Sequence, residues 1–440
     1  MNEKQDVPEQ QLTAENVSRM GAFSTTVAYV AQFYPLWFTY NQSRFATHNR
    51  LVGPDQVTPL YQIVVAINVD TLYASTFLNL AAEPVVLTIP ATTVTYSILT
   101  LDPYGVIIQS NIPKATPGTY AFTGPGFTGT LPAGMTAVAM PLNVSVLIFR
   151  ADKFSSGGQD QTSEAGQFRA SLKLQALSGY VGDPSGGAAM ILPEVAFAIP
   201  YKTIADTLIT KAPITFLKGL QTAVASSNTP AMPPAVKALS DHFNGLFGDG
   251  GANPSELSAG ARAAHESILD RYLTHTGPTN WITFTNIGAW GHHVVERASI
   301  TEFIQYGNGH STAAYYHAFK DATGVALDGD NQQGYVLTFS AGQIPQAQRF
   351  WSVTAYTPDS IELIENSANK YEVASYEPGL QTQPDGSISI YIATELPSGV
   401  PMANWLPVAD GRFNVMLRVY GPEGSVASNT YVPPGIQRNQ

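Results

Sequence analysis

Near the start of the chain, apolar residues recur every three or four positions, which predicts one amphipathic helix. The helix is expected to begin at Ala14, and its apolar stripe consists of Val17, Met20, Phe23, Val27, Val30 and Tyr34. Pro35 cannot donate a backbone hydrogen bond, so we expect it to end or kink this helix. Residues 1–13 are polar and predict a loose tail.

The pattern then changes to an alternation with period two, which predicts a series of short strands. Glycine and proline separate these strands, as in GPGFTG and LPAG. Many short strands with such turns are typical of a β-sandwich or jelly roll. The expected strands are Val85–Ile89, Tyr96–Leu101, Val106–Ile108, Thr119–Phe122, Thr136–Met140 and Val144–Phe149.

Helical spacing returns in the middle of the chain. A short helix is predicted at Gln167–Leu177, followed by an apolar strand at Ile191–Ile199. Two further helices are indicated by the apolar positions from Val236 to Leu246 and by the start signal at Asn253. A last helical pattern runs from about Val294 to Phe319, with a break near Gly307 and Gly309.

Alternating strands return in the last third, and they complete the predicted architecture. They are Tyr335–Phe339, Phe350–Tyr356, Tyr371–Tyr376, Ile388–Ile392 and Phe413–Tyr420. We predict an α+β, mainly β fold with two jelly-roll-like β-sandwich lobes, an N-terminal helix and a helical insertion between the lobes. The expected parts are an N-terminal tail and helix (residues 1–45), a first β lobe (46–200), a helical insertion (201–320) and a second β lobe (321–440).

The two strand regions resemble each other in places. TYSILTLDP at 95–103 is echoed by FWSVTAYTP at 350–358, and Val144–Arg150 by Asn414–Val419. Strands are short and use few residue types, so chance similarity and a true duplication of one lobe are both open interpretations.

Composition excludes several classes of function. Charged residues make up 12% of the chain, and 22 basic against 33 acidic residues give a net charge of −11. An acidic chain without a basic run is not expected to bind nucleic acid or anionic membranes. Without cysteine, disulfides and thiolate chemistry are excluded.

The compartment stays open. The polar start lacks the apolar core of a signal peptide, so we expect a cytoplasmic protein or one exported after loss of a leader. No window has the 18 apolar residues of a membrane span.

Two ordered sets of motifs carry a family resemblance. The first is Asn68-Val69-Asp70-Thr71-Leu72-Tyr73, followed by Glu83–Leu87 and Tyr96–Asp102. The second contains Leu327-Asp328-Gly329, Phe350–Thr354, Asn404-Trp405-Leu406-Pro407, Arg418 and Tyr420. The chain resembles the bacterial and viral family that joins the domains of unknown function DUF1254 and DUF1214. The resemblance implies β lobes with helical insertions and no settled chemistry.

Two positions depart from the family pattern. Lys370 stands where the family usually has arginine, and Gly291-His292-His293 stands where a glycine–tyrosine loop is usual. A lysine cannot reproduce the bidentate fork of an arginine. Site roles at these positions are therefore not carried over.

Asp70 and Tyr73 are the predicted catalytic residues, with Asn68 beside them as a ligand-binding amide. A carboxylate, an amide and a phenol together suit acid–base chemistry on a polar substrate. The alternative is an Asx turn, in which Asp70 caps the backbone.

The other substrate-binding candidates are Arg297, Tyr315, Asn404 and Trp405. The structural alternative is an ion pair for Arg297 and an aromatic contact between layers for Tyr315. For Asn404 and Trp405 it is a loop in which the asparagine bonds the backbone and the tryptophan packs over it. His292, His293 and Glu296 have a partial metal-ligand spacing but lack the HExxH pattern, so no metal site is predicted.

Two functions of different classes remain. The first is an enzyme, hydrolase- or lyase-like, acting on a small polar or carbohydrate-like substrate in a pocket between the lobes. The second is a non-catalytic double jelly-roll protein for ligand binding or self-assembly, with capsid-like architecture. No motif identifies a cofactor. The low charge and the many strand edges predict a homo-oligomer.

Overall fold

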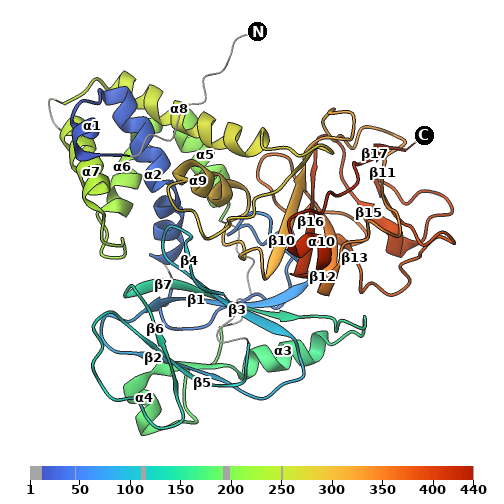
Figure 1. Ribbon diagram of the computed structural model, residues 1–440, viewed down its shortest axis with the longest axis horizontal. Helices are drawn as coiled ribbons and strands as arrows, with labels where there is room; N and C mark the ends of the chain where they lie inside the picture. The colour runs from blue at the N-terminus through green and yellow to red at the C-terminus, as the bar shows by residue number, and fades with distance from the viewer. Residues whose placement is uncertain (1–11, 45, 111–114, 192–198, 249–250, 440) are drawn as a thin grey trace.

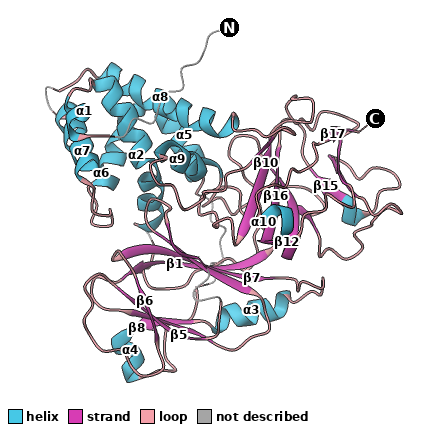
Figure 2. Cartoon of the chain, viewed as in Figure 1, coloured by secondary structure: helices cyan, strands magenta, loops and turns pink. Residues whose placement is uncertain are grey.

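The computed structural model describes residues 12–44, 46–110, 115–191, 199–248 and 251–439. Figure 1 shows a helical unit at the upper left, an N-terminal β lobe below it and a C-terminal β lobe at the right. Helices contain 28% of the residues and strands 25%, which confirms the α+β class. Figure 2 shows that most helix lies in the upper unit and most strand in the two lobes.

The helical unit is built around the predicted N-terminal helix. Helix α2 (Ala22–Ser43) follows the short α1 (Ala14–Ser18) and buries 16 of its 22 residues against α6, α7, α8 and α9. Pro35 lies inside α2, so the prediction that it might end the helix is wrong. Contacts on all sides of α2 offset the hydrogen bond that proline removes. The other helices of this unit are α5 (Tyr201–Lys211), α6 (Pro213–Val224), α7 (Pro234–Phe247), α8 (Pro254–Leu273) and α9 (Val294–Phe303).

The N-terminal lobe consists of two four-stranded sheets with the orders β1-β7-β3-β4 and β6-β5-β2-β8. Apolar side chains from both sheets form the core between them, including Leu72, Leu87, Ile98 and Phe149. The elements are β1 (Thr71–Asn79), β2 (Val85–Ile89), β3 (Tyr96–Leu101), β4 (Ile107–Ser110), β5 (Gly118–Thr123), β6 (Thr136–Ala139), β7 (Val144–Asp152), α3 (Thr162–Ser171), β8 (Lys173–Ala176) and α4 (Leu177–Gly182).

The C-terminal lobe also consists of two sheets, with the orders β13-β12-β16-β10-β9 and β15-β14-β11-β17. Its own core includes Leu337, Val353, Ile390 and Leu417. The elements are β9 (Trp281–Ile282), β10 (Ala313–Ala318), β11 (Tyr335–Phe339), β12 (Ala347–Tyr356), β13 (Glu372–Ala374), β14 (Ile388–Ala393), the 3-10 helix η1 (Met402–Asn404), β15 (Trp405–Pro407), β16 (Asn414–Pro422), α10 (Gly424–Ala427) and β17 (Gln437–Arg438).

The two lobes have the same strand topology. Taken in chain order, β1 to β8 correspond to β10 to β17, and each sheet of one lobe repeats the strand order of its counterpart, with β9 added at one edge. The single parallel pairing in each set also corresponds, β5 with β6 and β14 with β15. This agreement, together with the sequence echoes, favours duplication of one lobe over chance similarity.

Two predicted elements are corrected by the structure. The helical pattern expected after the break near Gly307 and Gly309 is wrong: α9 ends at Phe303, and Tyr315-Tyr316-His317 lie on strand β10. This strand belongs to the C-terminal lobe, which therefore begins before the expected boundary at residue 321. The predicted helix Gln167–Leu177 is also wrong in extent, since α3 ends at Ser171 and β8 begins at Lys173. Within the expected strand Ile191–Ile199, residues 192–198 lie outside the described residues.

A third core joins the three parts of the molecule. It includes Ile148 of the N-terminal lobe, Tyr356 and Met416 of the C-terminal lobe, and Tyr272 and Phe303 of the helical unit. Each lobe presents one face of its first sheet to this core and uses the other face for its own sandwich. Polar side chains on those two facing sheets form the candidate site.

Candidate functional site

Asp70 reaches from the start of β1 into the C-terminal lobe. Its side chain is fully buried. Carboxylate oxygen Oδ2 accepts a hydrogen bond from Ser352 Oγ at 2.8 Å, and Oδ1 lies 2.7 Å from the hydroxyl of Tyr376. Both oxygens are thus bonded to side chains of the other lobe. Asp70 is therefore a bridge between the lobes rather than the backbone cap of an Asx turn.

Glu372 on β13 forms a pair with Asp70 through the same phenol. The Tyr376 hydroxyl is 2.8 Å from Glu372 Oε1 and is fixed by the ring of Phe154, which stacks on Tyr376 with a centroid distance of 4.2 Å. Burial and the neighbouring charge of Asp70 raise the pKa of Glu372 well above its ordinary value. A phenol has a single proton to donate, so one of its two contacts needs a proton on the carboxyl group. The shared phenol thus requires a proton on one of the two carboxyl groups, and the raised pKa of Glu372 favours that residue.

Arg418 of β16 supplies positive charge beside Asp70. The residue is buried, and its guanidinium donates to the carbonyl oxygen of Ala66 and lies 5.5 Å from the centre of the Tyr356 ring. Ala66 has a φ of 50° and hydrogen-bonds to Ile361, which has a φ of 55°. A positive φ in a β-branched residue is strained. Such strain concentrates where the surrounding structure fixes a functional arrangement.

A second arginine, Arg150 of β7, lies among tyrosines in the same interface. Its guanidinium is 5.4 Å from the centre of the Tyr73 ring. It donates to Asn308 Oδ1 at 3.2 Å and to the carbonyl oxygen of Tyr306 at 3.1 Å. The Asn308 side chain in turn donates to the Tyr315 hydroxyl at 2.9 Å.

The amide of Asn68 donates to the hydroxyl of Tyr420 on β16. Together with the preceding contacts, this places four predicted site residues, Asn68, Asp70, Tyr73 and Tyr315, in one interface.

The other predicted site residues take no part in the Asp70 network. Asn404 accepts from the amide of Gln381 and donates to two backbone carbonyls of its own lobe, and Trp405 donates to the carbonyl oxygen of Ala393. These contacts match the structural alternative of a satisfied loop. Arg297 of α9 donates to the carbonyl oxygen of Gln32, and its guanidinium lies 4.6 Å from the centre of the Tyr104 ring.

Sequence reasoning missed Ser352, Glu372, Tyr376 and Arg150. The hydrogen bonds of Asp70 span 282 and 306 residues of sequence, to Ser352 and Tyr376 respectively. No local spacing can reveal such pairs. The one available signal was the alternation of β7 and β16, which puts Arg150 and Arg418 at positions where a strand would otherwise carry an apolar residue.

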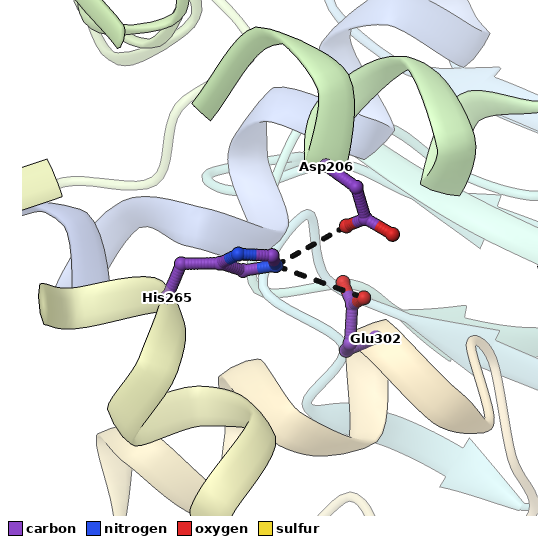
Figure 3. A group of neighbouring side chains, drawn as sticks. All are labelled: Asp206, His265 and Glu302. Carbon is purple, nitrogen blue, oxygen red and sulfur yellow. Dashed lines mark ion pairs between the residues drawn. The ribbon is translucent and has the colours of Figure 1, made fainter. Parts of the chain in front are cut away.

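The histidine motif at 292–296 does not form a ligand cluster. His292 and His293 are exposed, and Glu296 pairs with Arg271 and accepts from Asn286 at 2.7 Å. A different group, Asp206, His265 and Glu302, has its ligand atoms within 4.8 Å of one another inside the helical unit. Figure 3 shows the imidazole of His265 directed at both carboxylates.

A lysine already supplies the cation in this second group. Lys202 Nζ is 2.7 Å from Asp206 Oδ2 and also contacts Glu302, which accepts from the Tyr34 hydroxyl as well. Burial alone would lower the pKa of His265, but the two carboxylates outweigh it and raise the pKa to about 9. The group therefore holds two protonated cations against two acids, which is a buried ion network. A metal ion would have to displace Lys202.

Comparison with known proteins identifies the family. Residues 48–176 match the model described as protein of unknown function (DUF1254), and residues 312–424 match protein of unknown function (DUF1214). The chain belongs to the DUF1254/DUF1214 family. The order of the two domains agrees with the resemblance in the sequence. A search of curated proteins gives no match.

Two solved structures are similar to this chain. The VPA0106 protein from Vibrio parahaemolyticus has a TM-score of 0.60 and 20% identity, covering 95% of this chain and 99% of that one. This likeness shows the shared fold. A putative uncharacterized protein from Burkholderia cenocepacia has a TM-score of 0.45 and 14% identity, covering 97% and 98% of the two chains. Among the described residues, no helix has the length and apolar character needed to cross a membrane.

Proposed function

We propose that this DUF1254/DUF1214 protein is an enzyme, hydrolase- or lyase-like, that uses the Asp70–Glu372 pair for acid–base chemistry on a small polar substrate. The observation that carries the proposal is the shared phenol of Tyr376, which lies within 2.8 Å of both carboxyl groups. Two carboxyl groups that share a hydrogen-bond partner and have unlike surroundings are a recurrent arrangement for proton transfer.

Glu372 is the proposed acid. Burial and the charge of Asp70 raise its pKa well above the ordinary value, which favours the protonated form that a general acid needs. The residue is partly exposed, whereas Asp70 is fully buried, so Glu372 lies nearer the solvent side of the pair. Its second oxygen, Oε2, is buried on the side of the Asp70 carboxyl group and accepts no hydrogen bond from the backbone of the described residues.

Asp70 is proposed to act through Tyr376. Hydrogen bonds from Ser352 and Tyr376 hold its carboxylate, and the charge of Arg418 lies beside it. In this role the charge of Asp70 raises the pKa of Glu372, and the phenol of Tyr376 connects the two carboxyl groups. A carbohydrate-like substrate loses its main support, because Asn404 and Trp405 bond within their own lobe.

A second candidate is a non-catalytic joint between the lobes, as in the ligand-binding or self-assembly alternative. The observation in its favour is that Asp70 and Asp152 both bond across the interface, with Arg349 Nε donating to Asp152 Oδ2 at 2.9 Å. Such a joint requires only the charged pairs between the lobes and does not convert a substrate. The two candidates predict different results when Glu372 loses its acidic proton. The enzyme loses turnover, whereas the joint has no turnover to lose.

The test is a panel of p-nitrophenyl esters, p-nitrophenyl glycosides and small hydroxy acids, assayed with the wild type, Glu372→Gln and Glu365→Gln. Glutamine keeps the shape of Glu372 and removes its acid. Turnover that falls at least about 100-fold in Glu372→Gln and is unchanged in Glu365→Gln supports the proposal, since acid–base groups contribute about 10²–10⁴-fold. Equal turnover in all three, or none in any, overturns it and favours the joint.

A further inference from the structure

The facing sheets of the two lobes carry the same three residue types at corresponding positions. In the C-terminal lobe, Arg418 of β16 is the direct cross-strand partner of Tyr315 on β10 and of Ser352 on β12. In the N-terminal lobe, Arg150 of β7 is the direct partner of Tyr73 on β1 and of Ser97 on β3. Cross-strand partners point to the same face of a sheet. Each lobe therefore presents a tyrosine–arginine–serine row to the other lobe.

The row of the C-terminal lobe is occupied by a carboxylate. Asp70 Oδ2 accepts the hydrogen bond of Ser352, and the buried charge of Arg418 lies beside it. This carboxylate comes from the opposite lobe, at the start of β1. The occupied row thus shows which chemical group such a row binds.

The row of the N-terminal lobe has the same donors and no acid. The partners of Arg150 among the described residues are neutral groups, namely Asn308, the Tyr306 carbonyl and Tyr73, and none of the ion pairs found between those residues includes it. Arg150 Nε and Ser97 Oγ are both buried without a hydrogen-bond partner. The two residues are 5% and 2% exposed, so water does not satisfy them from the surface. A buried guanidinium without a counter-charge is unfavourable.

We propose that this second row is a binding site for a small carboxylate anion, held by Arg150 Nε and Ser97 Oγ beside the ring of Tyr73. A planar carboxylate offers two oxygens to these two donors, as Asp70 does to Ser352 and Tyr376. Formate and acetate are the smallest carboxylates that offer this planar pair of oxygens. This proposal does not depend on catalysis at Glu372.

The test measures binding of sodium formate and sodium acetate to the intact protein by isothermal titration and by the shift of its melting temperature. Sodium chloride at equal ionic strength and sodium phosphate serve as comparison salts. A saturable effect of formate or acetate beyond chloride is expected, because an anion that binds only the native state raises its apparent stability.

A matched pair of serine variants localises the effect. Ser97→Ala removes a donor of the site, whereas Ser145→Ala removes another buried, unpartnered hydroxyl from the opposite face of the same sheet. Loss of one hydrogen bond to a charged group is expected to weaken binding by about 10-fold in Ser97→Ala and not in Ser145→Ala. Arg150→Gln should abolish binding. If Arg150→Gln does not fold, the serine pair decides the outcome.

Three results would overturn the proposal. They are no saturable effect of either carboxylate over chloride, equal binding in Ser97→Ala and the wild type, and binding of phosphate alone. Glu372→Gln should bind acetate as the wild type does. That variant therefore separates a failure of this anion site from a failure of the proposed acid–base chemistry.

Discussion

The ion network of the helical unit makes the stability of the protein depend on pH through His265. The carboxylates of Asp206 and Glu302 raise the pKa of this buried histidine to about 9 in the folded protein, against 6.5 in the absence of partners. Because the folded value is the higher one, the stabilisation is complete below pH 6.5 and is lost as the pH rises through about 9. Alkaline solution should therefore weaken the fold well before lysines and tyrosines titrate.

The magnitude follows from the two values. At about 1.36 kcal/mol for each pH unit, the difference is worth about 3 kcal/mol in full. Linkage of the two states gives a fall of about 2 kcal/mol in the free energy of unfolding between pH 7.5 and 9.5. Another buried histidine, His317, has its pKa lowered to about 3 by burial, so its contribution changes between pH 3 and 6.5 and is constant in this window.

Urea denaturation at intervals from pH 7.5 to 9.5 measures this fall directly. His265→Asn should remove most of the dependence on pH, and His292→Asn, at an exposed position, should retain it. A wild-type protein with constant stability over the window would refute the reasoning. The same conclusion would follow if His265→Asn and the wild type lost stability in parallel.

Two further predictions concern stability. Lys202→Met and Lys237→Met each break a lysine–aspartate pair four residues apart in a helix, at 2.7 Å and 2.6 Å. The first also leaves the fully buried Glu302 without its lysine, so urea denaturation should show a loss of about 3–5 kcal/mol, against at most about 0.5 kcal/mol for the exposed second pair. Similar losses in both would contradict the buried network. Gly53→Ala should lower the melting temperature, because a Cβ there would overlap the carbonyl oxygen of Tyr73 on β1, whereas Gly342→Ala meets open space and should not. An unchanged melting temperature in Gly53→Ala would contradict this close approach.

Sequence periodicity predicted several strands well, because these strands alternate between a buried face and a more exposed face. Ile388–Ile392 and Tyr335–Phe339 agree closely with β14 and β11 for this reason. The run from Val294 to Phe319 misled, since Tyr315, Tyr316 and His317 all lie on a strand that is buried on both faces. A fully buried strand has no polar face, so its period cannot be distinguished from that of a buried helix.

The site was predicted in part for a related reason. Asn68, Asp70, Tyr73 and Tyr315 lie in motifs whose polar residues exceed what strand packing needs, and the structure brings them together. Glu372 could not be predicted, because nothing near it in the sequence marks it as the partner of an aspartate 302 positions earlier in the numbering. Asn404 and Trp405 misled because a loop that satisfies its own backbone also needs an amide and a large ring.

The central place of α2 has a consequence for the synthesis of the chain. Tyr34 on α2 bonds Glu302 on α9, 268 residues later. At about 5–20 residues per second, roughly 15 to 50 s separate the appearance of the two partners on the ribosome. For most of that interval a helix that finally buries 16 of its 22 residues lacks its contacts with α8 and α9. The apolar face of α2 is therefore exposed while the whole N-terminal lobe is synthesised, and the helical unit can close around α2 only after that lobe has been made.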